Sequence, residues 1–186
     1  MAKTDKVWYA CYGSNLNADR FRAYIEGTVN PANGIREDGC TDTSLWTDTM
    51  VRSFRGQLYF AKSSGKWQRG GVAFIDPDAD GTIYMRLYLI TREQFLEVQD
   101  QEGTWYSRRV DLGVAEDGNP ICTFTAPYRY PSNPPSKLYR DWIESALIRE
   151  CGIPASIAKS YLDRAINMRR KRSGMQTYLL ALSIIS

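Results

Sequence analysis

The sequence predicts an α+β fold, in which a small and mainly antiparallel sheet is followed by two helices. Short apolar runs bounded by turn-forming residues recur between residues 7 and 126, which is typical of strands joined by hairpins. Apolar residues at helical spacing then recur from residue 138 onward, after a proline-rich segment. The chain has 186 residues with 43% hydrophobic content, so we expect one domain over 1–186 with its own core.

The first predicted strand ends in a tight polar turn. The run Val7–Tyr12 contains no charge and stops at Gly13, so it predicts a buried strand followed by a chain reversal. Ser14 and Asn15 can bond neighbouring amides, which leaves N–H groups of the turn free to face a ligand. A helix over 17–25 with an asparagine cap is expected next. Strand, turn and helix start are typical of an anion or carbonyl site, although a plain turn at Gly13 fits the pattern equally well.

The middle of the chain alternates predicted strands and turns. Residues 27–49 are rich in Gly, Asn, Thr and Asp and predict a long surface loop. The glycine pair Gly70-Gly71 indicates a bulge or a close backbone approach. Three aspartates in 76–81 suggest calcium, but Pro77 and the missing glutamate break the EF-hand pattern, so we expect no metal. The predicted strands are 54–61, 70–75 and 82–90.

A short helix with a well-defined start is expected after the third of these strands. Thr91 and Gln94 form a capping box, and the helix they begin leaves Glu102 in a turn just past its end. From the residues alone, Glu102 is more simply a surface carboxylate than a functional one. The strands predicted next are one containing Trp105 and Tyr106, and a hairpin of 108–112 with 120–126.

The C-terminal part predicts two helices. One carries the apolar stripe of 138–147 and stops at Gly152, and the other begins at Pro154. The side chains expected to point inward from the second helix are Ile157, Tyr161, Ala165 and Met168. Periodicity leaves the apolar tail 178–185 open between a strand and a helix.

Composition excludes several classes of catalytic site. Histidine is absent, which removes Ser-His-Asp and Cys-His arrangements and the commonest metal ligand. The four cysteines are too widely spaced for a zinc or thiol-exchange motif, so we expect structural thiols at Cys11, Cys40, Cys122 and Cys151. Acid–base chemistry must therefore rest on carboxylates, tyrosines or lysines.

Charge and hydropathy indicate neither a nucleic-acid partner nor a membrane. The chain carries 24 basic and 21 acidic residues, a net charge of +3. No stretch has the length and apolarity of a membrane span or a signal peptide, so we expect a cytoplasmic protein. The basic run 169–172 follows a predicted helix, where cations complement the helix dipole, and this interpretation outweighs a nucleic-acid patch.

Three motifs together resemble the γ-glutamyl cyclotransferase-like family. Tyr12-Gly13-Ser14-Asn15-Leu16 after an N-terminal strand is similar to the family signature. Asp100-Gln101-Glu102-Gly103 resembles the segment that carries the family's catalytic glutamate, and Pro135-Ser136-Lys137-Leu138-Tyr139 resembles its Pro-Ser-x-x-Tyr. The motifs occur in the family's order and span roughly the first three quarters of the chain, which makes the set more specific than any one motif.

The resemblance implies a fold, a reaction and a site. It implies that the sheet curls into a small β-barrel, and that the free α-amine of a γ-glutamyl group attacks its own γ-amide carbon and releases 5-oxoproline. Glu102 would be the general acid and base. The residues implied in substrate binding are Tyr12, Gly13, Ser14, Asn15, Leu16 and Tyr139. The resemblance implies a small-molecule γ-glutamyl substrate, no metal and no cofactor, and we expect a monomer or homodimer.

Two departures and one rival interpretation remain open. Met85 stands where the family's strand glycine is expected, and Ala146-Leu147 replaces the customary Gly-Ala pair. Either change would reshape the pocket, so the resemblance does not fix the substrate. The rival to an enzyme is a non-catalytic small-molecule-binding or interaction protein on the same fold.

Overall fold

The computed structural model describes residues 5–167 and has an α+β fold. Five strands form one sheet in the order β2-β5-β1-β7-β6. The N-terminal strand β1 lies at its centre, antiparallel to β5 and parallel to β7, and the other two pairings are antiparallel. The strands of this sheet are β1 (Lys6–Cys11), β2 (Thr49–Arg55), β5 (Thr82–Thr91), β6 (Arg108–Val114) and β7 (Pro120–Thr125).

The sheet is open, so the predicted barrel is wrong. Its edge strands β2 and β6 are not paired with each other, and β3 (Gln57–Ala61) pairs with β4 (Val72–Asp76) in a separate two-stranded sheet. The break lies at Gly56, whose φ of 135° bends the chain between β2 and β3. A Cβ there would lie 2.6 Å from Ile83 Cδ1 and 2.9 Å from the Asp76 carbonyl oxygen. The strand expected over 54–61 is therefore two strands in two sheets.

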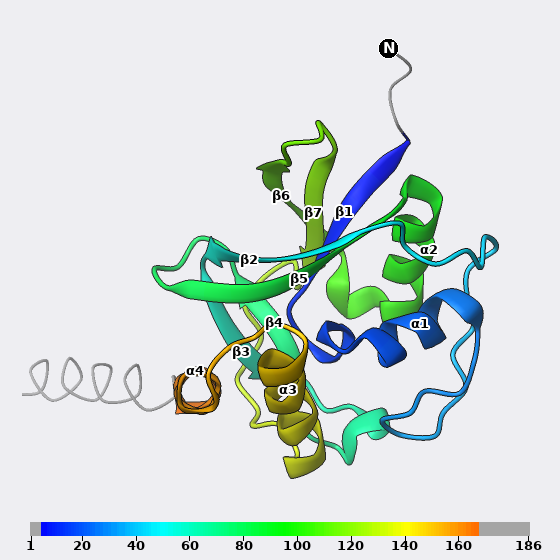
Figure 1. The fold of residues 1–186 in the computed structure, drawn as a ribbon. Helices are drawn as coiled ribbons and strands as arrows, with labels where there is room; N and C mark the ends of the chain where they lie inside the picture. Colours follow the sequence, from blue (N-terminus) through cyan, green and yellow to red (C-terminus); the bar gives the residue numbers. More distant parts are fainter. Residues whose placement is uncertain (1–4, 168–186) are drawn as a thin grey trace, which may run out of the picture.

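Four helices of the described chain pack around the strands, as Figure 1 shows. α1 lies against α2, and α2 covers β1 and β5. α3 contacts α4 and the short 3₁₀ turn η1 after β1, and α4 contacts β3. The bounds are η1 (Ser14–Leu16), α1 (Ala18–Glu26), α2 (Arg92–Glu102), α3 (Lys137–Arg149) and α4 (Ala155–Asn167). No helix in 5–167 has the length and apolarity to cross a membrane.

Local sequence signals set the ends of the first two helices. The Asn17 side chain accepts the Arg20 amide at 3.0 Å and begins α1, as the asparagine cap predicts. The capping box at the start of α2 is confirmed, with hydrogen bonds of 3.1 and 3.0 Å between Thr91 and Gln94. However, α2 continues to Glu102 and ends only at Gly103, whose φ is 79°. Glu102 is therefore the last residue of a helix, and not part of the turn that follows it.

Other predicted elements differ in extent. Residues Thr104–Tyr106 form the 3₁₀ turn η3 and not a strand. Ile157 is 43% exposed and does not point inward, whereas Tyr161 and Ala165 of the same helix are buried as expected. Residues 27–48 contain no helix or strand, which agrees with the predicted loop. Met168, the basic run 169–172 and the tail 178–185 lie outside the described residues.

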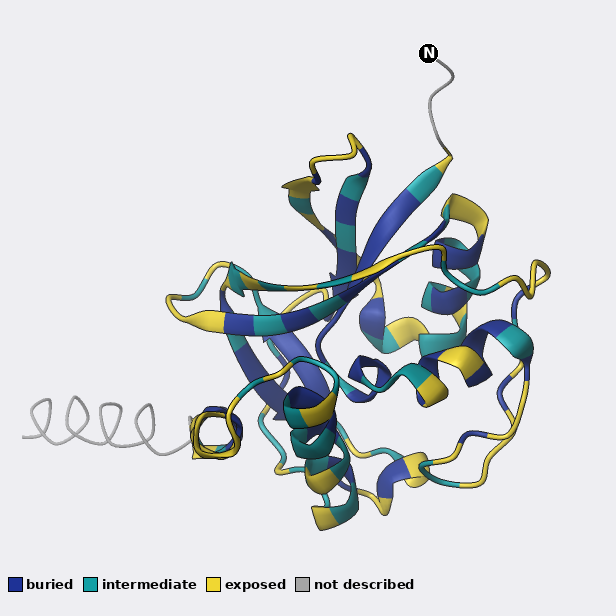
Figure 2. Cartoon of the chain, in the orientation of Figure 1, coloured by how far each residue is buried: buried dark blue, intermediate teal, exposed yellow. Residues whose placement is uncertain are grey.

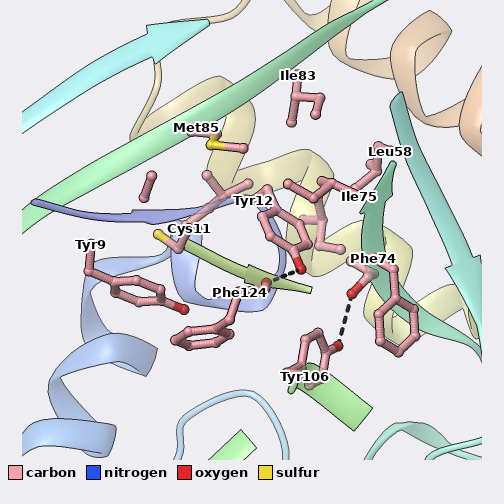
Figure 3. Close-up of a cluster of buried hydrophobic side chains, with 14 of the residues drawn as sticks. Tyr9, Cys11, Tyr12, Leu58, Phe74, Ile75, Ile83, Met85, Tyr106 and Phe124 are labelled. Atoms are coloured by element: carbon pink, nitrogen blue, oxygen red, sulfur yellow. Dashed lines mark hydrogen bonds between the residues drawn. The ribbon is translucent and has the colours of Figure 1, made fainter. Parts of the chain in front are cut away.

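The core is dominated by aromatic rings on the face of the central strands. The Tyr9 ring stacks on Phe124 at 5.1 Å between centroids and also contacts Phe21 and Phe95. Figure 2 shows that β1 is buried along almost its whole length. Figure 3 shows Tyr9 and Phe124 with other buried side chains of the core. Because both faces of β1 are covered, the turn that follows it begins inside the protein.

Candidate active site

The turn after β1 lines a small chamber, called the inner chamber below. Gly13 packs closely there, since a Cβ on it would lie 3.2 Å from the Tyr139 hydroxyl and 3.3 Å from Ala73 Cβ. The inner chamber holds about 30 Å³, room for one or two waters. Its lining comes from the β1 turn, β4, α2, η3, β7 and α3, namely Tyr9, Cys11, Tyr12, Gly13, Ser14, Asn15, Ala73, Glu102, Tyr106, Phe124 and Tyr139.

A second and larger space adjoins the inner chamber. This outer pocket holds about 360 Å³, and four residues line both spaces: Ser14, Glu102, Tyr106 and Tyr139. The rest of its lining comes from α1, the segment 63–72, Gln101 and Trp105. Glu102 thus lies at the junction of a small polar chamber and a pocket large enough for a small molecule.

The Glu102 carboxylate is oriented by Asn15, in the turn that follows β1. Asn15 Nδ2 donates a hydrogen bond of 2.9 Å to Glu102 Oε1. Burial raises the pKa of Glu102, while the charge of Arg20 and the Asn15 hydrogen bond oppose this increase. A carboxyl with a raised pKa and a fixed orientation is suited to proton transfer near neutral pH.

Three of the four tyrosine hydroxyls that line the inner chamber bond to the main chain, and that of Tyr9 accepts Asn15 Nδ2 at 3.4 Å. Tyr12 donates to the Phe124 carbonyl at 2.7 Å, and Tyr106 donates to the Ala73 carbonyl at 2.8 Å, as Figure 3 shows. The Tyr139 hydroxyl accepts the Ala73 amide at 3.3 Å. Burial raises the pKa of Tyr139 to about 12, so the phenol stays neutral at physiological pH.

Several polar groups at the turn have no partner within residues 5–167. The amides of Ser14 and Asn15 make no hydrogen bond in the described part of the chain, since the 3₁₀ turn uses only the amides of Leu16 and Asn17. The Asn15 Oδ1 atom is also buried without a partner there. Two donors and one acceptor are therefore available beside the Glu102 carboxylate.

A buried ion cluster lies behind the outer pocket. Glu37 accepts Arg20 Nη1 at 3.1 Å and Lys66 Nζ at 2.9 Å, and Asn30 Nδ2 donates to it at 2.8 Å. The side chains of Arg20 and Glu37 are 2% and 3% exposed, whereas that of Lys66 is 41% exposed. The cluster ties the long loop that holds Glu37 to α1 and to the segment beside the pocket.

The structure brings together most of the residues predicted from the sequence. Tyr12, Gly13, Ser14, Asn15, Glu102 and Tyr139 all line the inner chamber. Leu16 does not line either space; it is fully buried, and its carbonyl accepts the Tyr88 hydroxyl at 3.3 Å. The substrate-binding role of each of these residues stays a prediction.

The departures from the family pattern lie away from both spaces. Met85, Ala146 and Leu147 are buried in the core, and none of them lines the inner chamber or the outer pocket. Cys11 does line the inner chamber, but its thiol donates to the Asn15 and Arg86 carbonyls, and burial raises its pKa. This environment fits the structural thiol expected from the sequence.

The sequence did not predict that Arg20 and Lys66 line the outer pocket, or that Tyr106 lines both spaces. Arg20 carried a weak signal, because a cation three residues after a helix cap is not explained by the helix dipole. Lys66 and Tyr106 carried none, since each reaches the site from a short 3₁₀ turn that periodicity does not reveal.

No protein-family model matches the chain. Among curated proteins it is similar to histone deacetylase 5 from Arabidopsis thaliana, with 31% identity over 212 residues that cover 90% of this chain and 32% of that protein. The chain thus spans about a third of the length of that relative, and the name describes the longer protein.

Three solved structures are similar over most of the chain. A gamma-glutamyl cyclotransferase has a TM-score of 0.63 and 20% identity, covering 87% of this chain and 88% of that chain. An uncharacterized protein from Homo sapiens has a TM-score of 0.61 and 20% identity, covering 88% and 89%. YkqA from Bacillus subtilis has a TM-score of 0.57 and 18% identity, covering 87% and 54%. At these identities the likeness concerns the fold.

Proposed function

Because the chain has the fold of gamma-glutamyl cyclotransferase, we propose that it releases 5-oxoproline from a γ-glutamyl amide or peptide by intramolecular attack of the α-amine. One observation supports this most. The Glu102 carboxylate lies where the inner chamber meets the outer pocket, and the side-chain Nδ2 of Asn15 donates to it at 2.9 Å. A reaction that splits one substrate into a ring and a leaving amine needs a proton-transfer group at such a junction.

The proton balance of the reaction requires only one such group. The attacking nitrogen starts as an ammonium and ends as a lactam N–H, so it gives up two protons. The leaving nitrogen starts as an amide N–H and ends as an ammonium, so it gains two. A carbon–nitrogen bond forms and another breaks at the same carbonyl carbon, and Glu102 carries the protons from one nitrogen to the other. The proposed reaction consumes no water and needs no metal or cofactor.

The polar groups of the β1 turn fit the glutamyl part of the substrate. The unpaired backbone N–H groups of Ser14 and Asn15 can hold the α-carboxylate of the substrate, or the oxyanion that forms as the ring closes. The buried Asn15 Oδ1 can accept an N–H of the attacking amine. The inner chamber admits only the end of the glutamyl arm, so the rest of the arm lies in the outer pocket beside Tyr139, which lines both spaces. This restriction favours the curled conformation that the ring closure needs.

The raised pKa of Glu102 fits a group that both accepts and returns a proton. Burial is its largest cause, and Glu37 adds to it, whereas Arg20, Lys66 and Asn15 counteract it. An ordinary exposed carboxylate is too weak a base to take a proton from an ammonium efficiently, and burial reduces that mismatch.

The test is a substrate panel. The protein is incubated with γ-glutamyl amino acids and γ-glutamylamines, and 5-oxoproline is measured in the product. Release of 5-oxoproline that disappears in Glu102→Gln supports the proposal. If no compound is turned over while one of them raises the melting temperature, the protein is a binding module and the proposed reaction is wrong.

A further inference from the structure

The wall of the outer pocket contains two cations, Arg20 and Lys66. Both are paired with the single carboxylate of Glu37. Two cations share one anion, so the cluster carries an excess charge of one positive unit. Glu102 lines the same pocket, and this excess charge opposes the increase in its pKa. The N–H donors of Lys66 that do not bond Glu37 have no part in the ring closure itself.

Lys66 is the member of the cluster that a ligand can reach. Its side chain is 41% exposed, whereas that of Arg20 is 2% exposed. Its ammonium has three N–H donors, and Glu37 Oε2 at 2.9 Å takes one of them. Arg20 lies behind it with Nε buried and unpaired within residues 5–167, so it adds charge to the site without needing contact.

Aromatic rings form part of the outer pocket, together with polar residues such as Ser63, Ser64 and Gln101. Trp67 and Trp105 line it together with Tyr24. Trp67 is held in place by Tyr139, with ring centroids 4.5 Å apart, and by the Arg20 guanidinium 5.4 Å from its ring. A pocket of about 360 Å³ with fixed rings and one reachable cation favours an apolar body that ends in an anion.

We infer that the outer pocket binds the leaving group, and that Lys66 selects leaving groups that are amino acids with a bulky apolar side chain by bonding their carboxylate. This inference rests on the proposed function, because Glu102 fixes which end of the substrate lies in which space. The bulky side chain lies against Trp67 and Trp105, and the carboxylate of the released amino acid pairs with Lys66.

Two substrates that differ only in that carboxylate test the inference. They are γ-glutamyl-phenylalanine and γ-glutamyl-phenethylamine, compared by kcat/KM for 5-oxoproline release. We expect the first to be preferred roughly 10- to 100-fold, the range of one charge-assisted hydrogen bond. Equal values for the two compounds would overturn the inference and leave the proposed reaction intact.

Lys66→Met removes the charge and keeps the length of the side chain. We expect it to lower kcat/KM for γ-glutamyl-phenylalanine by roughly tenfold or more relative to γ-glutamyl-phenethylamine. A change in the pKa of Glu102 affects both substrates alike and cancels in this ratio. Arg69→Gln is the matched control, because Arg69 is an exposed cation of the same segment that lines neither space. An equal loss for both substrates in Lys66→Met would contradict a role in reading the carboxylate.

The design separates this inference from the reaction it rests on. If neither these substrates nor any other compound of the panel releases 5-oxoproline, the proposed reaction is wrong; if other compounds do and these two do not, the inference is wrong. In the first case, the melting temperature with free phenylalanine and with phenethylamine tests Lys66 directly. A shift produced by phenylalanine and lost in Lys66→Met supports the carboxylate site, and equal shifts from both compounds refute it.

Discussion

The inner chamber and the outer pocket are built by different means. Three tyrosines of the inner chamber bond to main-chain groups: Tyr12 bonds to Phe124, and Tyr106 and Tyr139 bond to Ala73. The charged wall of the outer pocket is held by a side chain, Glu37, on a loop without regular structure. A main-chain partner is present whatever the side-chain sequence is, whereas a side-chain partner is lost by one substitution.

The two spaces also differ in the role proposed for them: proton transfer at the inner chamber, and choice of leaving group at the outer pocket. The group proposed to move protons lies at the end of α2 and accepts a hydrogen bond from the Asn15 side chain, which belongs to the turn after the buried strand β1. The groups inferred to read the leaving group lie on segments that substitution can change without disturbing the sheet. We therefore expect substitutions at the inner chamber to affect turnover of every substrate, and those at the outer pocket to affect some substrates and not others.

The largest expected effect is at the inner chamber. Glu102→Gln keeps the shape of the side chain and removes its basicity, so turnover should fall by about 10²- to 10⁴-fold for all substrates. The measurement is kcat for 5-oxoproline release, with the melting temperature as a check on folding. Asp100→Asn is the control, because Asp100 is exposed on the same helix and lines neither space. Normal turnover in Glu102→Gln would refute the proposed mechanism.

The next effect tests the support of the outer pocket. Glu37→Gln leaves the buried Arg20 without an anionic partner, so the free energy of unfolding should fall by about 3–5 kcal/mol. Urea denaturation measures it. Asp78→Asn breaks the exposed pair with Arg108 and should cost less than about 1 kcal/mol. Equal losses in the two variants would mean that Glu37 does not organise the cluster.

A smaller effect is expected at the wall of the inner chamber. Tyr12→Phe leaves the buried Phe124 carbonyl without the hydroxyl that donates to it, which should cost about 1–3 kcal/mol in urea denaturation. Tyr128→Phe, at a side chain that is 67% exposed, should change the free energy of unfolding by less than about 0.5 kcal/mol. A loss in Tyr128→Phe as large as that in Tyr12→Phe would contradict the role given to the buried hydroxyl.

The last prediction concerns the pH dependence of the free energy of unfolding. The folded protein raises the pKa of Glu102 above the value it has in the unfolded chain, mainly through burial. Between those two values the folded state binds more protons, so the free energy of unfolding falls as the pH rises through that window. The Glu102→Gln variant has no carboxyl to titrate at this position. The free energy of unfolding of the variant minus that of the natural protein should therefore increase as the pH rises between the two pKa values, and stay constant above them. A difference that does not change with pH would show that Glu102 is not perturbed.

The parts of the site that lie close in sequence were predictable. An uncharged apolar run, a glycine and an asparagine cap determine β1, its turn and the start of α1 through interactions that span a few residues. The close backbone approach predicted at Gly70-Gly71 is confirmed, since a Cβ on either glycine would lie within 2.1 Å of the backbone of residues 133–136.

The parts that depend on distant contacts were not predictable. The open sheet follows from the break at Gly56, which the sequence contained as a glycine inside a strand pattern but which only the packing against Ile83 explains. Arg20 and Glu37 pair across 17 residues of chain, and nothing in either local sequence indicates the other. The extension of α2 to Glu102 depends on Gly103, whose φ of 79° the pattern did not reveal.

The central place of β1 has a consequence for how the chain reaches its native state. β1 is made before the strands it pairs with, which contribute residues 86–91 of β5 and residues 121–122 of β7. Contacts so distant along the chain form slowly, because a long loop must close before they stabilise anything. During synthesis the apolar run Val7–Tyr12 therefore leaves the ribosome long before either strand that will cover its edges. Until residue 122 has emerged, this segment is a ready target for chaperones and for pairing with another nascent chain.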